Sequence, residues 1–201
     1  MSVPDILREL MVELQLFERG ITDDAVLTAF EDVPRDRFVD EDDADVAYDD
    51  CALPLGITGE AISDPYATAW LLQAAEIRPG QRVLDVGTGS GYLAALAAHM
   101  GALVHTVERN PELVARAAVV LAALAPTVTV HHGDGWDGLP SQAPFDRVVV
   151  GCAAPEPSPH WLAQLAPDGL LVAQVGAELA VITADGTSRA VGPAGFAPLA
   201  R

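Results

Sequence analysis

The sequence predicts an α/β protein built on a doubly wound, mostly parallel sheet, with helices added at its N-terminus and an antiparallel edge at its C-terminus. Three observations support this fold class. From residue 64 onward, apolar runs of strand length alternate with helical patterns, as expected for parallel strands joined by crossover helices. A glycine-rich turn, residues 87–91, separates the first of these runs from the helix after it. The last two runs flank an Asp-Gly pair that predicts a hairpin.

Two helices are predicted ahead of the sheet. Ser2 can cap the first of them, and its apolar residues recur at helical spacing and form one stripe: Leu7, Leu10, Met11, Leu14 and Phe17. Gly20 ends this helix. Thr22 is the expected cap of the second helix, which stops before Pro34. The inward-facing residues of the second helix are expected to be Ala25, Val26, Ala29 and Phe30.

Residues 34–62 have little periodic pattern. A loop of this length in a compact domain is usually functional, for example as a lid over a site. Four residues are expected to hold it against the body of the protein: Phe38, Tyr48, Leu53 and Leu55. The loop overlaps an acidic stretch, residues 31–50, with ten acidic and two arginine side chains. A solvated surface is the simpler interpretation of this stretch, and a preference for basic or neutral peptides is the alternative.

The remaining elements follow the α/β alternation. Asp64 and Pro65 start a helix that runs to about Glu76, and Asn110 and Pro111 start another in the same way. The apolar face of the helix after Asn110 is expected to consist of Leu113, Ala117, Val120, Leu121 and Leu124. Further helices are expected over residues 92–100 and 161–165, and strands over 82–86, 103–107, 128–132, 147–152 and 169–175, with two short strands around 185–186.

The glycine-rich turn is the most informative motif of the chain. Its spacing is Gly-x-Gly-x-Gly, and the third glycine of a dinucleotide fingerprint would fall at Tyr92. Asp85, two residues before Gly87, would repel a pyrophosphate but suits a ligand with cationic groups, such as S-adenosylmethionine (SAM) with its sulfonium and ammonium. Glu108 ends the next strand, where an acid can bind ribose hydroxyls.

This order of strand, glycine turn, helix, strand and acid predicts a class I SAM-dependent methyltransferase with a Rossmann-like fold. The alternative is another kind of nucleotide-binding turn, or a purely structural loop. We expect a single domain over residues 1–201. Within it, residues 1–62 are expected to form N-terminal helices and a substrate-side loop, and residues 63–201 the SAM-binding core.

Composition narrows the expected partners. The formal net charge is −18, and arginine supplies all eleven basic residues, which argues against nucleic acid and against an anionic membrane surface. The N-terminus lacks the basic and apolar regions of a signal peptide. Cys51 and Cys152 are therefore expected to be reduced thiols in a cytoplasmic protein, which we expect to be a monomer. Since His131 and His132 point to opposite faces of a strand, no metal site is expected.

Several motifs outside the glycine turn narrow the class further. They are Gly-Ile-Thr-Asp-Asp-Ala-Val (20–26), Val-Pro-Arg-Asp-Arg-Phe-Val (33–39), Ala-Tyr (47–48), Leu-Pro-Leu-Gly (53–56), Ile-Ser-Asp-Pro-Tyr (62–66), His-Gly-Asp-Gly-Trp (132–136) and Ala-Ala-Pro-Glu (153–156). In this combination, spread over nearly the whole chain, they resemble the motifs of the protein-L-isoaspartate O-methyltransferase family. SAM-dependent enzymes in general share the glycine turn but not these outer signatures.

The resemblance implies transfer of a methyl group from SAM to the α-carboxylate of an L-isoaspartyl residue, which leaves S-adenosyl-L-homocysteine. Such residues form in aged proteins when Asn or Asp cyclises to a succinimide that reopens the wrong way. The ester re-forms the succinimide spontaneously, so that repeated cycles repair the protein. The partners implied are isoaspartyl-containing proteins or peptides. The acceptor carboxylate, with a reference pKa of about 3.3–3.7, is ionised at neutral pH and needs no general base.

The resemblance also implies which residues form the site. Ser63 is the expected catalytic residue, because its hydroxyl can donate to the acceptor carboxylate; a helix-start role is the simpler interpretation, and the two can coexist. The expected SAM-binding residues are Asp85 near the methionine end, Glu108 on the ribose, Asp134 and Gly135 beside the adenine, and the glycines Gly87, Gly89 and Gly91. The expected substrate-binding residues are Ile62, Ser63, Pro65 and Tyr66. Asp134 is alternatively a turn residue within Gly-Asp-Gly.

The sequence departs from the family pattern at three places. Ala61 stands where Thr is common, which removes a hydroxyl. Cys152 stands where Ala is common, and we expect it to act as a small packing residue. The segment from Val175 to Phe196 is several residues shorter than usual and lacks a clear match to the family's Gln-containing motif. Because this region helps to cover the substrate peptide in the family, substrate range is the property most open to change.

Three other functions fit part of these observations. One is a related carboxyl methyltransferase that tailors an Asp residue of a ribosomal peptide natural product, although such enzymes are expected to carry an added C-terminal domain. Another is a small-molecule SAM methyltransferase, in which residues 34–62 should close over a small pocket. The third is an inactive SAM-binding protein that acts through a partner. The presence of Ser63, Asp85, Glu108 and Asp134 argues against this third function.

Overall fold

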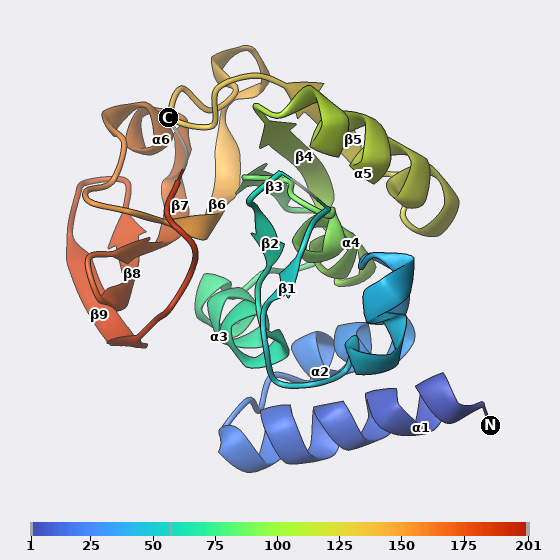
Figure 1. Ribbon diagram of the computed structural model, residues 1–201. Coiled ribbons are helices and arrows are strands. Elements are labelled where there is room, and N and C mark those ends of the chain that lie inside the picture. Colours follow the sequence, from blue (N-terminus) through green and yellow to red (C-terminus); the bar gives the residue numbers. More distant parts are fainter. Residues whose placement is uncertain (1, 57, 200–201) are drawn as a thin grey trace.

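The computed structural model describes residues 2–56 and 58–199. Its central sheet has seven strands: β3 (Arg82–Val86), β4 (Leu103–Glu108), β5 (Thr129–His132), β6 (Phe145–Ala154), β7 (Leu165–Val175), β8 (Glu178–Thr183) and β9 (Ser188–Pro193). They lie in the order β5-β4-β3-β6-β7-β8-β9 (Figure 1). The strands from β5 to β7 in this order are parallel, and β8 and β9 are antiparallel. The predicted doubly wound sheet with an antiparallel C-terminal edge is confirmed.

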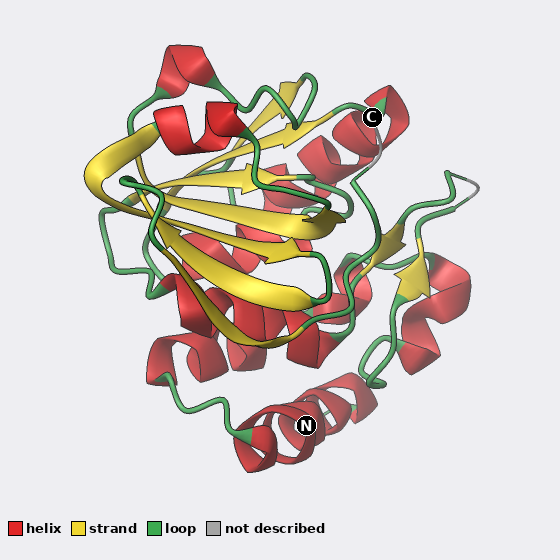
Figure 2. Ribbon diagram, turned by 90° about the vertical axis from the view of Figure 1, so that its left-hand side faces the viewer, coloured by secondary structure: helices red, strands yellow, loops and turns green. Residues whose placement is uncertain are grey.

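The alternation of side chains along the central strands divides the core into two layers. Val83 and Val149 pack with the helices α3 (Pro65–Ala75), α4 (Tyr92–His99) and α5 (Pro111–Leu124). Leu84 and Val150 belong to the opposite layer, with Trp161 of α6 (Pro159–Ala163). Most of the helices therefore lie on one side of the sheet (Figure 2). Because both faces are covered, the central strands are apolar on both faces.

The helix starts within the core follow the predicted chemistry. The side chain of Asp64 accepts a hydrogen bond from the backbone N–H of Ala67 at the start of α3. Asn110 accepts one from Glu112 at the start of α5, and each helix has proline at its first turn. The predicted apolar face of α5 is wrong at Leu124, which is 40% exposed. Leu124 is the last residue of the helix and lies beyond its buried positions, Leu113, Ala117 and Leu121.

The N-terminal helical segment buries a different face from the predicted stripe. It begins as α1 (Val3–Leu10) and continues through a π-helical turn (Met11–Leu16) and a 3-10 turn (Phe17–Arg19). Only Met11 of the stripe is buried, whereas Leu7, Leu10, Leu14 and Phe17 are exposed. A π-helical turn holds more residues than an α-helical turn and so changes the angular phase of the segment. This turn does not by itself explain the buried face, because Leu7 and Leu10 lie in α1 before it and are already exposed. Val12 and Leu16 pack in the core with Met11.

The second helix, α2 (Asp24–Asp32), has a different cap from the predicted one. The carboxylate of Asp23, and not the hydroxyl of Thr22, accepts hydrogen bonds from the first turn. Ala25 was expected to face inward but is exposed, because it lies in that first turn beside the cap. The other predicted inward-facing residues are fully buried: Val26, Ala29 and Phe30.

Residues 34–62 contain more structure than their irregular pattern indicates. Two 3-10 turns (Arg35–Arg37 and Glu41–Val46) are followed by the short antiparallel strands β1 (Leu53–Pro54) and β2 (Ala61–Ile62). The four expected anchors are all buried: Phe38, Tyr48, Leu53 and Leu55. Strand β2 leads directly into Ser63 and α3, and Figure 1 shows β1 and β2 between α3 and α4 at the end of β3.

The C-terminal segment returns across the sheet after the β8–β9 hairpin. Residues 196–199, which we call the strap, run beside the end of β6. The N–H of Ala153 donates to the carbonyl of Ala197, and the N–H of Leu199 donates to the carbonyl of Ala153, both at 2.7 Å. The side chain of Gln174 accepts a hydrogen bond from the N–H of Phe196 (2.7 Å). The strap is therefore fixed at the carboxyl ends of the parallel strands. None of the helices in the described residues is long and apolar enough to cross a bilayer.

Candidate active site

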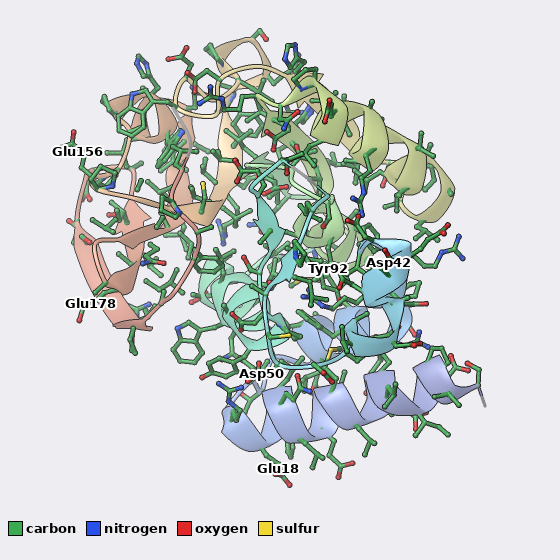
Figure 3. The ribbon with its side chains drawn as sticks, viewed as in Figure 1. Glu18, Asp42, Asp50, Tyr92, Glu156 and Glu178 are labelled. Atoms are coloured by element: carbon green, nitrogen blue, oxygen red, sulfur yellow. The ribbon has the colours of Figure 1, made fainter. Side chains whose placement is uncertain are left out.

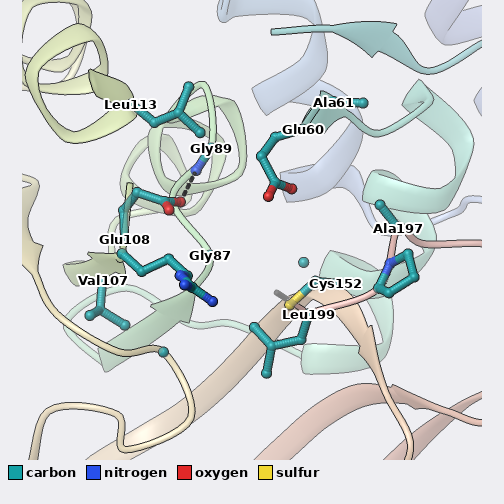
Figure 4. A pocket seen from close by; sticks show the side chains of 14 residues that line it. Glu60, Ala61, Gly87, Gly89, Val107, Glu108, Leu113, Cys152, Ala197 and Leu199 are labelled. Carbon is teal, nitrogen blue, oxygen red and sulfur yellow. Dashed lines mark hydrogen bonds between the residues drawn. The ribbon is translucent and has the colours of Figure 1, made fainter. Parts of the chain in front are cut away.

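Two cavities adjoin each other at the carboxyl end of β3. The first lies between the glycine turn, β2 and the strap, and its walls include Glu60, Glu108 and Arg109 (Figure 4). We call it the acidic cavity. The second is lined by the hydroxyl-bearing residues Ser63, Thr68, Thr88, Ser90 and Tyr92. We call it the hydroxyl cavity. Their position is the one that ligands occupy in open α/β sheets, outside the carboxyl ends of the strands.

The glycine turn forms part of both cavities. Gly87 and Gly89 line both of them, and their φ angles of 89° and 52° lie in the left-handed region that favours glycine. Gly91 lines neither cavity. A Cβ atom on Gly91 would lie 3.0 Å from Cδ1 of Leu121, so this glycine allows α4 and α5 to pack closely. Of the three glycines of the turn that were predicted to bind SAM, the structure brings Gly87 and Gly89 to the cavities.

Glu108 presents a rigid carboxylate to the acidic cavity. Its Oε2 accepts a hydrogen bond from the N–H of Gly89 (3.0 Å; Figure 4), and its Oε1 accepts one from the N–H of Asn110 (2.9 Å). Each carboxylate oxygen keeps a further lone pair that can accept from a ligand. A carboxylate held in this way suits two neighbouring hydroxyls, which agrees with the ribose contact expected from the sequence.

Asp85 lies beneath the glycine turn and lines neither cavity. It is fully buried, and its Oδ2 accepts a hydrogen bond from the hydroxyl of Thr106 (2.8 Å), which also contacts the hydroxyl of Thr88. Its Oδ1 has no hydrogen-bond partner. Burial, with a smaller contribution from the charge of Glu108, raises the pKa of Asp85 to about 7. A buried carboxylate with an unpartnered oxygen is an electrostatic fit for a cationic ligand at the turn above it.

Glu60 is a site residue that was not predicted from the sequence. This residue directly precedes β2, is half-buried, and points its carboxylate into the acidic cavity (Figure 4). Its position three residues before Ser63 is the only signal in the sequence that could have indicated a role. The walls carry two acids, Glu60 and Glu108, against one cation, Arg109, and Asp85 lies beneath the glycine turn. The acids therefore outnumber the cation, and the acidic cavity suits a ligand that carries positive charge, as SAM does.

Cys152 contributes to the same cavity. Its Sγ lies 3.6 Å from the position that a Cβ atom on Gly87 would take, so the thiol packs on the glycine turn as expected and also forms part of the wall. Burial and the neighbouring carboxylates raise the pKa of the Cys152 thiol to about 12. The thiol is therefore protonated at neutral pH and presents an uncharged surface to the cavity.

Asp134 and Gly135 differ in how they relate to the acidic cavity. Gly135 lines it, and a Cβ atom there would lie 3.0 Å from Cγ1 of Val86. Asp134 does not line it and is exposed. The carboxylate of Asp134 accepts a hydrogen bond from the N–H of Trp136 (2.9 Å), which is the turn role that the Gly-Asp-Gly sequence also allows.

The hydroxyl cavity contains two of the four predicted substrate-binding residues. Ile62 and Ser63 line it, and none of the residues on its walls is charged. Pro65 is buried at the start of α3. Tyr66 stacks on Trp70 and under the guanidinium of Arg19, in a separate surface groove. An uncharged cavity with several hydroxyls can accept a carboxylate without electrostatic repulsion from its walls.

The wall shared by the two cavities contains only small residues: Ala61, Gly87, Gly89 and Gly151. None of them carries a side chain larger than methyl. The strap covers both cavities from outside, with Phe196 on the hydroxyl cavity and Ala197, Pro198 and Leu199 on the acidic one. The family resemblance implied a covering role for the region that ends at Phe196, whereas no role at the site was expected for residues 197–199. A group can therefore pass from a ligand in one cavity to a ligand in the other across a narrow, covered contact.

The fold and this site together define the class of the protein. A parallel sheet that is doubly wound about β3, a glycine turn after that strand, and an acid at the end of β4 make this chain a class I SAM-dependent methyltransferase. Residues 7–187 match the family described as Protein-L-isoaspartate(D-aspartate) O-methyltransferase (PCMT). The chain belongs to this family.

Individual relatives agree with this assignment. The protein-L-isoaspartate O-methyltransferase of Methylorubrum extorquens is 45% identical over 96% of this chain and 88% of its own length. The enzyme of the same name from Gloeobacter violaceus is 48% identical over 84% of this chain and 82% of its own length. Among solved structures, a β-aspartate methyltransferase (PCMT) from Plasmodium falciparum in complex with S-adenosyl-L-homocysteine has the same fold. Its TM-score is 0.83 at 24% identity, over 100% of this chain and 99% of that one.

Proposed function

We propose that this chain transfers a methyl group from SAM to the α-carboxylate of L-isoaspartyl residues in damaged proteins or peptides. Membership of the family and the names of relatives at 45–48% identity support this activity. The observation that carries the proposal is the pairing of two cavities of different electrostatic character across a wall of alanine and glycine. The acidic cavity suits the cationic donor, and the uncharged cavity suits the anionic acceptor.

The acidic cavity is the proposed SAM site. When bound there, SAM supplies an electrophilic methyl group on a positively charged sulfur. Glu108 is held by two backbone N–H groups and would bind the ribose hydroxyls. Glu60 on the wall and Asp85 beneath the turn would attract the cationic groups. Gly87, Gly89 and Gly135 allow the ligand to lie directly against the backbone.

Ser63 is the proposed catalytic residue in the hydroxyl cavity. Its hydroxyl would donate a hydrogen bond to one oxygen of the acceptor carboxylate and so direct the lone pair that attacks. The acceptor is already ionised at neutral pH, since the reference pKa of an α-carboxyl is about 3.3–3.7. The protein therefore has to position this carboxylate and exclude water, and the strap and β2 close the site on its outer side.

The proposal is tested with two peptides that are identical except for one L-isoaspartyl or L-aspartyl residue. Transfer of label from methyl-labelled SAM is measured for each. Transfer to the isoaspartyl peptide alone is the expected result. Transfer to neither peptide, with SAM still bound, would contradict the proposal and favour a dedicated peptide or small-molecule substrate.

Replacement of Ser63 by alanine tests its assigned role. Turnover of the isoaspartyl peptide is expected to fall about 10-fold or more, because the acceptor loses the group that orients it. The affinity for SAM should change by less than about twofold, since Ser63 does not line the acidic cavity. Ser188→Ala on the exposed edge strand β9 is the matched control. Unchanged turnover at saturation with a large loss of SAM affinity would reverse the assignment.

We also infer a division of labour along the chain. Residues 1–62 would shape the acceptor side and residues 63–201 the SAM side, with exceptions in both directions. Glu60 and Ala61 belong to the wall of the acidic cavity, and the hydroxyl cavity is lined mainly by residues after 62: Ser63, Thr68, Thr88, Ser90, Tyr92 and Phe196. Two free thiols, Cys51 and Cys152, support a reducing compartment such as the cytoplasm. A monomer is proposed, and light scattering after gel filtration would test it.

A further inference from the structure

Arg35, the arginine of the Val-Pro-Arg motif, is a buried cation that touches neither SAM nor substrate in the proposed function. Its side chain is 0% exposed. The Nε–H donates to the carbonyl of Ala47 (2.8 Å), and Nη2 donates to the carbonyls of Ser63 (2.8 Å) and Cys51 (3.5 Å). One side chain therefore ties together three points of the segment between α2 and α3.

The environment of Arg35 is unusual for a buried charge. Among residues 2–56 and 58–199, no carboxylate forms an ion pair with it, and its Nη1 has no hydrogen-bond partner. An unpaired buried cation costs several kcal/mol of desolvation, so an apolar residue would suit a merely structural position better. Hydrogen bonds from a charged donor offset part of this cost, at about 1.5–3 kcal/mol each.

Two of the groups that Arg35 touches belong to the hydroxyl cavity. One of the two carbonyls that accept from Nη2 is that of Ser63 itself, at 2.8 Å. The guanidinium also lies over the ring of Tyr92, 5.3 Å from its centroid, and Tyr92 is the first residue of α4 after the glycine turn. Figure 3 shows Tyr92 in the interior, between the N-terminal helices and the sheet. Arg35 thus lies directly behind the cavity, in contact with the acceptor segment and with the start of α4.

We propose that Arg35 is a positioning residue for the methyl acceptor. It fixes the backbone of Ser63 relative to the glycine turn, so that the serine hydroxyl points at the acceptor carboxylate. Its positive charge favours an anion in a cavity whose walls carry no charge. This inference rests on the proposed function, because the acceptor carboxylate belongs to that function.

The choice of arginine over lysine follows from geometry. A planar guanidinium presents several N–H groups in a fixed fork and can bind carbonyls of separate segments at once, whereas an ammonium binds as a point charge. Arg35→Lys therefore keeps the charge and loses the fork. Arg35→Met keeps the approximate volume and loses both.

A double-mutant cycle tests whether Arg35 acts through Ser63. Arg35→Lys is expected to lower kcat for the isoaspartyl peptide about 10-fold to 100-fold when Ser63 is present, because small misplacements of a catalytic group have effects of this size. In the Ser63→Ala background the same change should lower kcat by less than about twofold, since no hydroxyl remains to be positioned. The affinity for SAM should be nearly unchanged in both backgrounds. Equal losses in the two backgrounds would overturn the inference.

Arg147→Lys is the matched control. Arg147 is also buried and donates to the backbone carbonyls of Ala75 and Glu76, but it lies at the start of β6 and lines neither cavity. Arg147→Lys makes the same chemical change as Arg35→Lys and is expected to leave kcat unaltered, even if the melting temperature falls. Arg35→Met should additionally raise KM for the peptide, because it removes the charge behind the cavity.

Hydrogen exchange provides a readout that does not depend on activity. Arg35→Lys should speed amide exchange in residues 47–51 and 61–64 by about 10-fold or more while the turn at 87–91 stays protected. If the wild-type protein were inactive on the isoaspartyl peptide, the proposed function would be refuted. Comparison of amide exchange in the wild type and in Arg35→Lys would still show whether Arg35 holds residues 47–51 and 61–64 in place. Unchanged exchange in these residues would overturn the inference even if the wild type is active.

Discussion

The carboxylate of Asp85 shows how one residue can couple ligand binding to pH. It is fully buried beneath the glycine turn, with one oxygen bonded to Thr106 and the other unpartnered. Without a ligand, burial favours the neutral acid and raises its pKa to about 7. Positive charge brought close to the turn therefore makes ionisation of the Asp85 carboxyl group less costly.

The affinity for SAM is expected to rise between about pH 6 and about pH 8. At the lower pH Asp85 is mostly protonated, and a bound cation must displace that proton, which weakens binding. At the higher pH the carboxylate is already ionised. Calorimetric titration with SAM across this range measures the effect, and Asp85→Asn should remove it. A variant that keeps the same pH dependence would assign it to another group.

Glu60 is a second single residue whose charge should affect ligand binding, because its carboxylate lies on the wall of the acidic cavity. SAM carries a positive sulfur that S-adenosyl-L-homocysteine lacks, so an acidic wall distinguishes donor from product. Glu60→Gln should lower the preference for SAM over S-adenosyl-L-homocysteine about 3-fold to 10-fold, measured as the ratio of their Kd values. Glu178→Gln, on the exposed start of β8, is the control. Equal weakening of both ligands would argue for a purely geometric role.

At the scale of elements, the glycine turn combines two separate requirements. Gly87 and Gly89 leave space for ligands, whereas Gly91 leaves space for Leu121 of α5. Sequence spacing alone groups these glycines together, because the pattern carries no information on which helix packs behind the turn. Only the packing of α4 against α5 separates the third glycine from the other two.

Gly91→Ala is expected to destabilise the protein more than Gly80→Ala. Both glycines have φ near +85°, so both variants cost about 1–2 kcal/mol of backbone strain. At Gly80 a Cβ atom would meet nothing within 4 Å, whereas at Gly91 it would lie 3.0 Å from Leu121. Overpacking should add about 1–3 kcal/mol at Gly91. Urea unfolding of both variants measures the difference, and equal losses would contradict the packing role.

Some of these elements could be predicted from the sequence, and others could not. The alternation of strands and helices, the caps at Asp64 and Asn110 and the place of the glycine turn after the first strand of the sheet follow from local chemistry and could be predicted. The buried face of the N-terminal helix could not, since Leu7 and Leu10 of the apolar stripe are exposed while Val12 and Leu16 pack in the core. The strap and Glu60 reach the cavities through tertiary contacts that no local pattern encodes.

At the scale of the whole molecule, the dominant feature is negative charge. The net charge is −18, and part of it is concentrated in the acidic stretch 31–50. Figure 3 labels exposed acids both in this stretch, Asp42 and Asp50, and outside it, Glu18, Glu156 and Glu178. Repulsion between such charges opposes the compact state, because unfolding moves them apart. The electrostatic field of this net negative charge also repels anionic macromolecules, which agrees with the expectation from the sequence that the protein does not bind nucleic acid.

Salt is therefore expected to stabilise the fold. The melting temperature should rise by a few degrees between about 0.02 M and about 0.5 M NaCl, because the screening length shortens to below the spacing of many surface charges. Choline chloride should have a similar effect if screening is the cause. A melting temperature that falls with salt would show that attractive ion pairs outweigh the net repulsion.

The thin wall between the two cavities has a consequence for inhibitor design. Because Ala61, Gly87, Gly89 and Gly151 leave no long side chain between the cavities, a single compound can span both. Such a compound would join an adenosine-like half to a carboxylate-bearing half by a linker of a few atoms. Joining the halves makes the second contact intramolecular, so the compound should bind far more tightly than either half alone.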